Sequence, residues 1–495
     1  SPSPNNHTSS SPLPNSEATR PSYSPEALNI APHEITGTLQ SKLATQIRVR
    51  GALTIKEFMT AALTHPVHGY YMRREEVFGR GGDFVTSPEV SQVFGELIGV
   101  WCVACWERLG KPSRLRLIEA GPGRGTLIAD VLRSTAVFPE FRTSLTVDLI
   151  EVSHHLRGVQ QQTIATAVGD ADALDVRWHE SIEHVEADPS IPELCLAHEF
   201  LDALPVHQLV RTPRGWRERM VELTELKKSA KVDEEATPTA IEEGEDGTPT
   251  DCRDLEADAR IFDFVVSANP TPASVLFGAR LGGGEEESGA EEASAGDAGE
   301  RGSVEAVPAE QHEVDQAGNA VEILDSAEIC PAAIGFVQQL CKRMAVTRGA
   351  ALMIDYGSDS TPADSLRGIH RHAAVHPLHL PGEVDLSVDV DFSTLRQVAQ
   401  ETASGLRCPP LSTQRDFLAA MGLEARINAL LRHTKDKEMR SDLVQSAGRL
   451  VASPGMGTAY KVFALAHADV GPEGVAGFAT APRLSEAQDD DEDIA

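Results

Sequence analysis

The chain has 495 residues, 41% of them hydrophobic, which is enough to bury the core of one large domain or of several smaller ones. Its formal net charge is −31 at pH 7, and this balance argues against DNA or RNA as a partner because phosphate binding needs basic patches. No run of about eighteen apolar residues is present, so we expect no membrane-spanning helix.

The N-terminal region is predicted to be a disordered tail followed by two helices. Residues 1–38 open on a Ser- and Pro-rich stretch with almost nothing to bury, so we expect folded structure to begin at residue 39. A helix is predicted to begin after Thr54 and to end at the His65–Pro66 step. A glycine-rich loop follows, and then a helix that holds Ser87 and Pro88 in its first turn.

The most informative segment is EAGPGRGT, from Glu119 to Thr126. It lies between an apolar stretch that is typical of a strand, Arg114–Ile118, and a helix-like stretch, Leu127–Arg133. A strand, a glycine turn and a helix form the first unit of a doubly wound, Rossmann-like α/β nucleotide-binding fold. Gly121, Gly123 and Gly125 allow a tight turn that can lie against a ligand, and Pro122 lies between the first two. We therefore expect Gly121→Val to place a branched side chain where the ligand must lie.

The acid at Glu119 narrows the class of ligand. A dinucleotide fold places a pyrophosphate at the helix N-terminus, and a neighbouring carboxylate would repel that anion. A ligand with an ammonium and a sulfonium group prefers a carboxylate there, and S-adenosylmethionine is such a ligand. The turn therefore favours a methyltransferase over a nicotinamide-dependent dehydrogenase, although glycine-rich turns alone are weak evidence.

A second apolar strand, Leu145–Ile150, ends on Glu151. An acid at the end of the second strand of such a fold hydrogen-bonds ribose hydroxyls, and it is expected roughly 20 residues after the glycines. Glu151 lies slightly farther along the chain than that. The alternative is that Glu151 only caps the helix predicted over His155–Ala167.

Two further strands are predicted near Val176–His179 and over Leu194–Ala197. The second is followed by HEFLDALP, in which Glu199 and Asp202 are three residues apart. Ligands of open α/β sheets bind at this carboxyl edge, and two acids suit a cationic acceptor such as a guanidinium. We expect both acids to be catalytic. On spacing alone, it is equally possible that they cap helices and pair with surface arginines.

The second half of the chain contains an acidic insert and the remaining strands. Residues 231–321 are rich in Glu, Gly, Ala and Asp, and they separate two parts of one domain, 39–230 and 322–480. Within the insert, the apolar stretch Ala259–Pro272 is a possible strand that rejoins the fold. A fifth strand is predicted over Gly349–Gly357, and an antiparallel strand near Lys461. Between them a helical insertion, 393–450, is expected to cover the active-site face, and residues 481–495 form an acidic tail.

No metal site is predicted. The histidines of one Pro-bearing loop lack helical ligand spacing and a nearby acid set, and the CxxC pair lies in an apolar helix pattern without a second CxxC. These residues are His370, His372, His376, His379, Cys102 and Cys105. The seven scattered cysteines favour a reducing compartment over a disulfide framework.

Five long motifs occur in one order that resembles a known family: GDFVTSPEVSQVFGELIG, IEAGPGRGTLIADVLR, HEFLDALPVHQ, IDYG and LPGEVDLSVDVDF. Together they resemble the mitochondrial complex I assembly factor (MidA-like) family of class I S-adenosylmethionine-dependent protein arginine methyltransferases. The resemblance covers the chain from about residue 39 to the strand near Lys461, without the acidic insert. This family usually has Asn where this chain has His198.

The resemblance implies an enzyme of the mitochondrial matrix that makes symmetric dimethylarginine in the 49-kDa subunit of complex I, an early assembly step. An alternative is a non-catalytic assembly chaperone that binds the same partner. By position, the residues of the glycine motif and Glu151 would bind the methyl donor, the GDFVTSPE loop would close over it, and Glu199 and Asp202 would face the substrate. The predicted donor-binding residues are Glu119, Gly121, Pro122, Gly123, Gly125, Glu151, Gly82, Asp83, Phe84, Thr86, Ser87 and Pro88.

Overall fold

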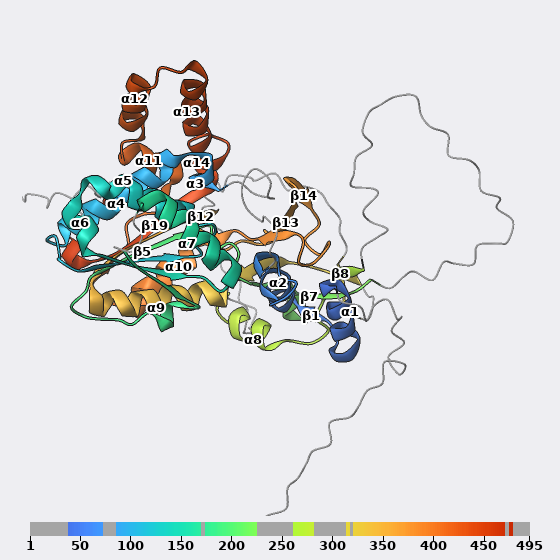
Figure 1. Cartoon of the computed structure of the whole chain (residues 1–495). Helices are drawn as coiled ribbons and strands as arrows, with labels where there is room; N and C mark the ends of the chain where they lie inside the picture. The colour runs from blue at the N-terminus through green and yellow to red at the C-terminus, as the bar shows by residue number, and fades with distance from the viewer. Residues whose placement is uncertain are drawn as a thin grey trace, which may run out of the picture.

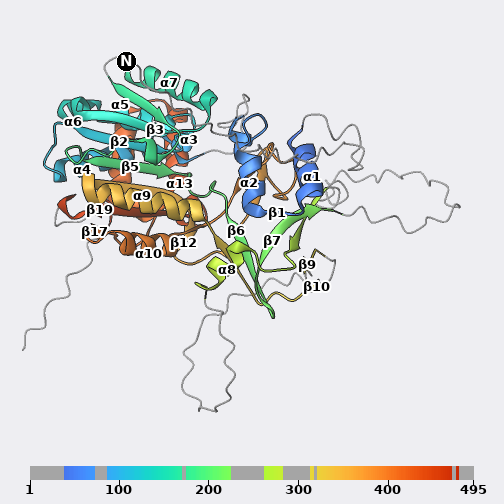
Figure 2. The ribbon, with the colours of Figure 1, turned by 90° about the horizontal axis from the view of Figure 1, so that it is seen from below.

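The computed structural model describes residues 38–72, 86–169, 174–224, 261–281, 313–316, 320–470 and 475–478. These residues form two lobes that lie side by side, one built on a nine-stranded sheet and one on a five-stranded sheet (Figure 1). The view from below shows the same division, with α9 and α10 on the large lobe and α1, α2 and β7 on the small one (Figure 2). Residues 1–37 of the predicted N-terminal tail, the whole predicted acidic tail, and Gly82, Asp83 and Phe84 of the predicted donor loop lie outside the described residues.

The large sheet has the order β17–β19–β12–β5–β2–β3–β4, with β16 added to β12 and β18 added to β19. Neighbours from β12 to β4 are parallel, whereas β19 is antiparallel to β12. All residues of β2 and β5 are buried, as expected of strands that helices cover on both faces. The bounds are β2 Leu115–Ala120, β3 Leu145–Ile150, β4 Asp175–His179, β5 Glu193–His198, β12 Gly349–Ser358, β16 Val390–Asp391, β17 Leu406–Arg407, β18 Ser412–Thr413 and β19 Tyr460–His467.

Helices cover both faces of this sheet, and the side chains of each strand alternate between them. Leu117 of β2 packs into a cluster with α4 Gln92–Arg108, α5 Thr126–Ser134, α6 Pro139–Ser144 and α7 His154–Val168. The next residue, Ile118, packs into the opposite cluster with α9 Pro331–Thr347 and α10 Phe392–Thr402. This alternation follows from the two-residue period of a strand. The prediction of a doubly wound α/β fold is confirmed.

The small lobe is an antiparallel sheet of order β1–β7–β6–β11, with β8 paired to β7. Two short helices, α1 and α2, and the segment α8 pack against it. The expected N-terminal helices are present in this lobe, whereas its sheet, apart from the possible strand at Ala259–Pro272, was not predicted. The bounds are α1 Leu39–Arg50, β1 Leu53–Thr54, α2 Ile55–Thr64, β6 His207–Thr212, β7 Gly215–Leu223, β8 Phe262–Val266, α8 Pro272–Gly278 and β11 Asp325–Ile329.

Local sequence signals explain several element boundaries. The Thr54 hydroxyl accepts a hydrogen bond from the Glu57 N–H at 3.1 Å, and the Glu57 carboxylate accepts one from the Thr54 N–H at 2.9 Å. This capping box starts α2 where we predicted it. The predicted helix after the glycine loop is interrupted at Ser91, which separates α3, Ser87–Val90, from α4. The apolar stretch within the predicted insert is strand β8, as the sequence suggested.

The remaining elements are short strands, short helices and the helices of the second half of the chain. They are β9 Glu313–Val314, β10 Ala320–Val321, β13 Arg367–His370, β14 Ala373–Val375, β15 Asp385–Ser387, α11 Gln414–Ala420, α12 Leu423–His433, α13 Lys437–Leu450 and α14 Met456–Ala459. The 3-10 helices are η3 Tyr70–Met72, η4 Thr135–Val137, η6 Ile182–His184 and η8 Ala468–Val470. Among the described residues, none of the helices has the length and apolar character that crossing a membrane requires.

Candidate functional site

A cavity of about 570 Å³ lies at the carboxyl ends of β5, β2, β3 and β4. This is the edge at which open α/β sheets bind ligands, and the volume suits a ligand of the size of a nucleoside derivative. Nine of the predicted site residues line it, namely Thr86, Pro88, Glu119, Gly121, Pro122, Gly123, Glu151, Glu199 and Asp202. The structure therefore brings the two predicted constellations, the glycine turn and the HEFLDALP acids, into one cavity.

Two predicted donor-binding residues lie behind the cavity lining instead. Gly125, with φ of +80°, precedes α5 and packs on Gln160 of α7, so its lack of a side chain permits helix packing. The Ser87 hydroxyl donates to Gln414 at 3.3 Å, and its N–H donates to the Glu199 carboxylate at 3.3 Å. Ser87 therefore supports an acid that lines the cavity.

The predicted helical insertion does not cover the site, and that expectation is wrong. None of residues 393–450 lines the cavity. Helix α10 packs on α9, while α12 and α13 project away from both lobes and contact α4 and α3 from outside (Figure 1). The physical reason is that apolar residues of this segment, such as Phe417 and Leu450, bury into the cores of the large lobe and leave the sheet edge open.

The glycine turn places backbone close to the cavity. Gly121 and Gly123 have φ of +66° and +53°, in the left-handed region that favours glycine. A Cβ on Gly121 would lie 2.7 Å from the Phe200 ring, so the turn also packs against the HEFLDALP loop. The glycine turn and the HEFLDALP loop therefore pack against each other, and a side chain at Gly121 would displace both.

Glu119 is the penultimate residue of β2, just before this turn, and is 2% exposed. Burial raises the pKa of its carboxyl to about 8, a shift that the Ile128 N–H opposes only partly. Its Oε2 has no hydrogen-bond partner among the described residues, although it lines the cavity. A buried carboxyl oxygen without a hydrogen-bond partner costs folding free energy, and a cationic ligand in the cavity would supply the missing partner.

Glu151 is held rigidly at the end of β3. Its Oε1 accepts from the Ser153 N–H at 2.7 Å, and its Oε2 accepts from the Gln160 amide at 3.0 Å. The same amide donates to the Gly123 carbonyl at 2.8 Å, so Gln160 ties the acid to the glycine turn. Helix α7 is capped by Ser153, so the alternative of a helix-capping Glu151 is wrong. Burial raises the pKa of Glu151.

Glu199 lies in a buried polar cluster at the end of β5. Its Oε1 accepts from the Tyr460 hydroxyl at 2.8 Å, and its backbone has a φ of +49°. Burial, together with the nearby Asp202, raises the pKa of the Glu199 carboxyl to about 8. Asp202 is buried as well, and burial raises its pKa, which the Arg367 guanidinium partly opposes. The alternative in which these acids cap helices and pair with arginines describes part of their contacts, because Glu199 accepts from the Ser87 N–H that begins α3 and Asp202 faces the Arg367 guanidinium.

Asp355, in the carboxyl-terminal half of β12, supports the site and was missed by sequence reasoning. Its Oδ2 accepts from the N–H groups of Phe200, Leu201 and Asp202, at 3.1, 2.8 and 3.3 Å. This single carboxylate therefore orients the loop that carries the two acids. The signal was present in the sequence, because IDYG lies at the carboxyl end of the fifth predicted strand, but we used it only as part of that strand and as a family motif, and assigned Asp355 no role.

His198 is packed between aromatic rings. Its ring lies 5.0 Å from that of Phe94 and stacks at 6.1 Å on that of Tyr460. Burial lowers the pKa of this imidazole to about 3, so it is neutral at physiological pH. Among the described residues, no group of three His, Cys, Asp or Glu side chains has a geometry for a metal ion.

A family model for S-adenosyl-L-methionine-dependent methyltransferases matches residues 97–409, more than half of the chain. The chain belongs to this family. The mitochondrial protein arginine methyltransferase NDUFAF7 of Danio rerio is 34% identical over 450 residues, which cover 87% of each chain. The Homo sapiens protein of the same name is 31% identical over 446 residues, covering 86% of this chain and 82% of the human one. The resemblance stated from the sequence is therefore confirmed.

A solved structure has the same fold. A chain from Burkholderia thailandensis, bound to S-adenosyl-homocysteine, aligns with a TM-score of 0.64 at 23% identity, covering 93% of this chain and 97% of that chain. At this identity the likeness concerns the fold alone. The methyl donor of this methyltransferase is S-adenosylmethionine, and the cavity fits it in volume and in the charge that Glu119 offers.

The raised pKa of Glu119 leads to a testable pH dependence of donor binding. Below pH 8 the Glu119 carboxyl of the ligand-free protein is mostly protonated. Only its carboxylate form can pair with the positively charged methyl donor. Binding of the methyl donor should therefore release one proton. We expect the affinity for S-adenosylmethionine to rise by up to about tenfold per pH unit between about pH 6 and 7.5. The Glu119→Gln variant should bind more weakly and without this slope. Calorimetry in buffers of different ionisation enthalpy measures the released proton, and a pH-independent wild-type affinity would contradict the assignment.

Proposed function

We propose that this methyltransferase methylates an arginine of a protein, and that the guanidinium lies beside Glu199 and Asp202. The observation that carries the proposal is the presence of these two buried acids in the same cavity as the glycine turn. Both pKa values are raised, so each carboxylate gains strongly from a cation placed against it. The relatives from Danio rerio and Homo sapiens, which are named protein arginine methyltransferases, support this choice of acceptor.

The donor is proposed to lie along the sheet edge. Glu119 would face its positive charges, Gly121, Pro122 and Gly123 would allow close approach, and Glu151 would hold the ribose hydroxyls. Thr86 and Pro88, which line the cavity, would lie against it. The donor brings a methyl group already activated by a sulfonium.

The protein's own contribution to transfer is position and charge. Glu199 and Asp202 would orient the guanidinium by charge-assisted hydrogen bonds. As a guanidinium nitrogen forms its bond to the methyl carbon, the bond from that carbon to the donor sulfur would break, S-adenosylhomocysteine would leave, and one of the two acids would accept the proton that the nitrogen loses. The fixed Tyr460 and Asp355 contacts hold both acids in place before the substrate arrives.

The family resemblance also suggests a specific protein substrate and a location in the cell. We propose symmetric dimethylation of an arginine in the 49-kDa subunit of complex I, in the mitochondrial matrix, as a step of complex I assembly. The curated relatives are named mitochondrial, which supports the mitochondrion as the location. The choice of the 49-kDa subunit as substrate and of symmetric dimethylarginine as product rests on the family resemblance.

The test is incubation of the full chain with the 49-kDa subunit and donor labelled on its methyl group, followed by mass spectrometry of the subunit. We expect two labelled methyl groups on one arginine, one on each terminal nitrogen. Binding of donor and subunit without transferred label would favour the alternative, a non-catalytic assembly chaperone. Label on lysine, or on both positions of one nitrogen, would correct the acceptor or the product.

A further inference from the structure

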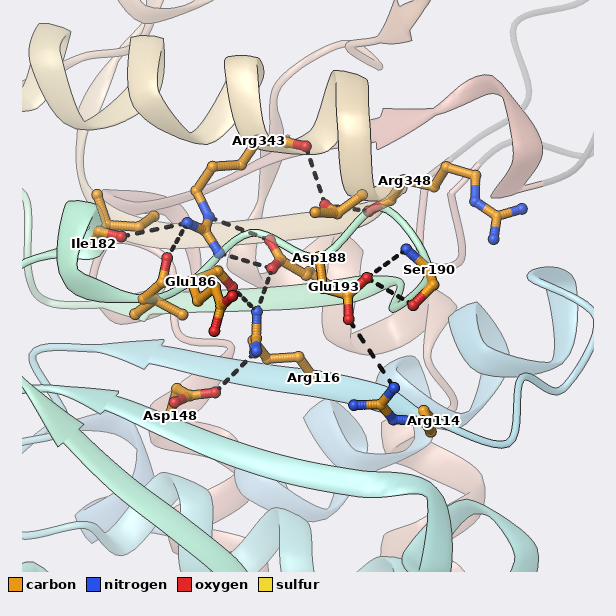
Figure 3. Close-up of polar contacts among 12 residues, drawn as sticks. Arg114, Arg116, Asp148, Ile182, Glu186, Asp188, Ser190, Glu193, Arg343 and Arg348 are labelled. Atoms are coloured by element: carbon orange, nitrogen blue, oxygen red, sulfur yellow. Dashed lines mark hydrogen bonds and ion pairs between the residues drawn. The ribbon is translucent and has the colours of Figure 1, made fainter.

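Two arginines and two acids form a buried network close to the amino ends of β2 and β5 (Figure 3). Arg116 of β2 lies 3.0 Å from both Asp148 of β3 and Glu193 of β5. Arg343 of α9 donates to the two carboxylate oxygens of Glu193 at 3.2 and 2.7 Å. All four side chains are buried. Their formal charges sum to zero, so the network has no net charge to bury.

The guanidinium groups also hold backbone carbonyls of one loop. Arg343 Nη1 donates to the Val185 carbonyl at 2.5 Å and to the Ile182 carbonyl at 3.5 Å. Arg116 donates to the Glu186 carbonyl. Figure 3 shows Arg343 reaching from its helix to Ile182 and Arg116 placed between Asp148 and Glu193. The loop that follows β4 is therefore attached to the network by three carbonyls.

The other side of the same loop lines the cavity. Its residues 180–183 are part of the lining, and η6 begins within them. The strand order β5–β2–β3–β4 places this loop at the opposite end of the cavity from Glu199. If methyl transfer occurs at Glu199, as the proposed function holds, the loop faces the adenosine end of the donor.

We propose that Arg343 and Arg116, joined by Glu193, are positioning residues that shape the adenosine end of the donor site without touching the donor. This inference rests on the proposed placement of the donor along the sheet edge. The Arg343 guanidinium bridges Glu193 and two carbonyls at once, because its planar fork offers five donors in fixed directions. A lysine keeps the charge but cannot satisfy this set, so the loop would lose its fixed position.

The experiment compares Arg343→Lys with wild type by calorimetry. The probes are S-adenosylhomocysteine and 5′-methylthioadenosine, which both carry the adenosine group. We expect both affinities to fall by about tenfold, the size expected from losing hydrogen bonds that position the loop. At saturating donor, kcat should stay within about twofold of wild type, so that KM for the donor changes and kcat does not.

Arg114→Lys is the matched control. Arg114 lies on the exposed side of the same region, 4.0 Å from Asp188, and should leave both affinities unchanged. Glu193→Gln keeps both guanidinium groups and weakens only their anchor, so it provides the readout if Arg343→Lys folds poorly. We expect the same direction of change in that variant.

Two outcomes overturn the inference. One is unchanged nucleoside affinity in a variant that melts as a folded protein, and the other is a fall in kcat with an unchanged KM for the donor, which a merely structural role would give. A wild-type chain that binds neither probe would instead contradict the proposed donor site. The two failures are therefore distinguishable.

Discussion

The Gly121→Val variant should lose S-adenosylmethionine binding, with an affinity at least about a hundredfold below that of wild type. The backbone at Gly121 has a φ of +66°, which a β-branched residue rarely adopts. From the sequence we expected the new side chain to collide with the ligand. The structure places the ring of Phe200 2.7 Å from the new Cβ, so the collision first displaces an aromatic residue that lines the cavity. Calorimetric titration with donor measures the loss.

The control for Gly121→Val is Gly110→Val. Gly110 also has a positive φ, +83°, but a Cβ there would meet no atom of the described residues within 4 Å. This variant shares the backbone strain, of about 1–2 kcal/mol, without disturbing the cavity. We expect it to melt at a lower temperature and to bind donor normally. Wild-type affinity in Gly121→Val would show that the donor does not lie against this turn.

The Glu199→Gln variant should keep donor affinity within about twofold and lose methyl transfer by about 10²–10³-fold, the usual effect of removing a group that stabilises charge at the reacting centre. Glutamine has the same shape and its carbonyl oxygen can still accept from the Tyr460 hydroxyl, so the fold should survive. What disappears is the negative charge that faces the guanidinium. Single-turnover transfer of a labelled methyl group at saturating donor measures the change.

The pH dependence of the methyl-transfer rate is a second test of the role of Glu199. Because the pKa of Glu199 is raised to about 8, the carboxylate fraction, and with it the wild-type rate, should rise as the pH increases and level off above pH 8. Glu199→Gln should lack this rise. Glu96→Gln is the matched control: Glu96 is a buried acid that pairs with Arg426 and does not line the cavity. An unchanged rate in Glu199→Gln would remove this residue from the acceptor site.

Much of the large lobe could be predicted because its signals are local. β3 was predicted at its observed bounds, Leu145–Ile150, because an apolar, β-branched run lies between a turn and a helix. The glycine turn and the acids that end β2, β3 and β5 could be placed at one edge because parallel strands all end on the same side. The contacts that hold these acids in place could not be predicted from the sequence. Asp355 reaches the N–H groups of residues more than 150 positions earlier, and no local pattern encodes such a pair.

The small lobe was missed for a related reason. Its strand β11 pairs with β6 across the whole acidic insert, and β8 lies within that insert. Antiparallel strands so far apart in the chain find their register through packing of the assembled core, which short windows of sequence do not contain. The helices of the insertion, residues 393–450, could likewise be predicted from local sequence. The part of the large lobe against which they pack could not.

The sequence by itself determined the parallel sheet, the glycine turn, the acids at the sheet edge and, through long ordered motifs, the methyltransferase family. These depend on residue type and spacing over a few turns of chain. Only the tertiary structure decided which acids share one cavity, which carboxylate holds their loop, and that Arg343, Glu193 and Arg116 hold the loop that follows β4. Those features arise where distant segments meet, and burial there sets both the hydrogen bonds and the pKa values on which the proposed chemistry depends.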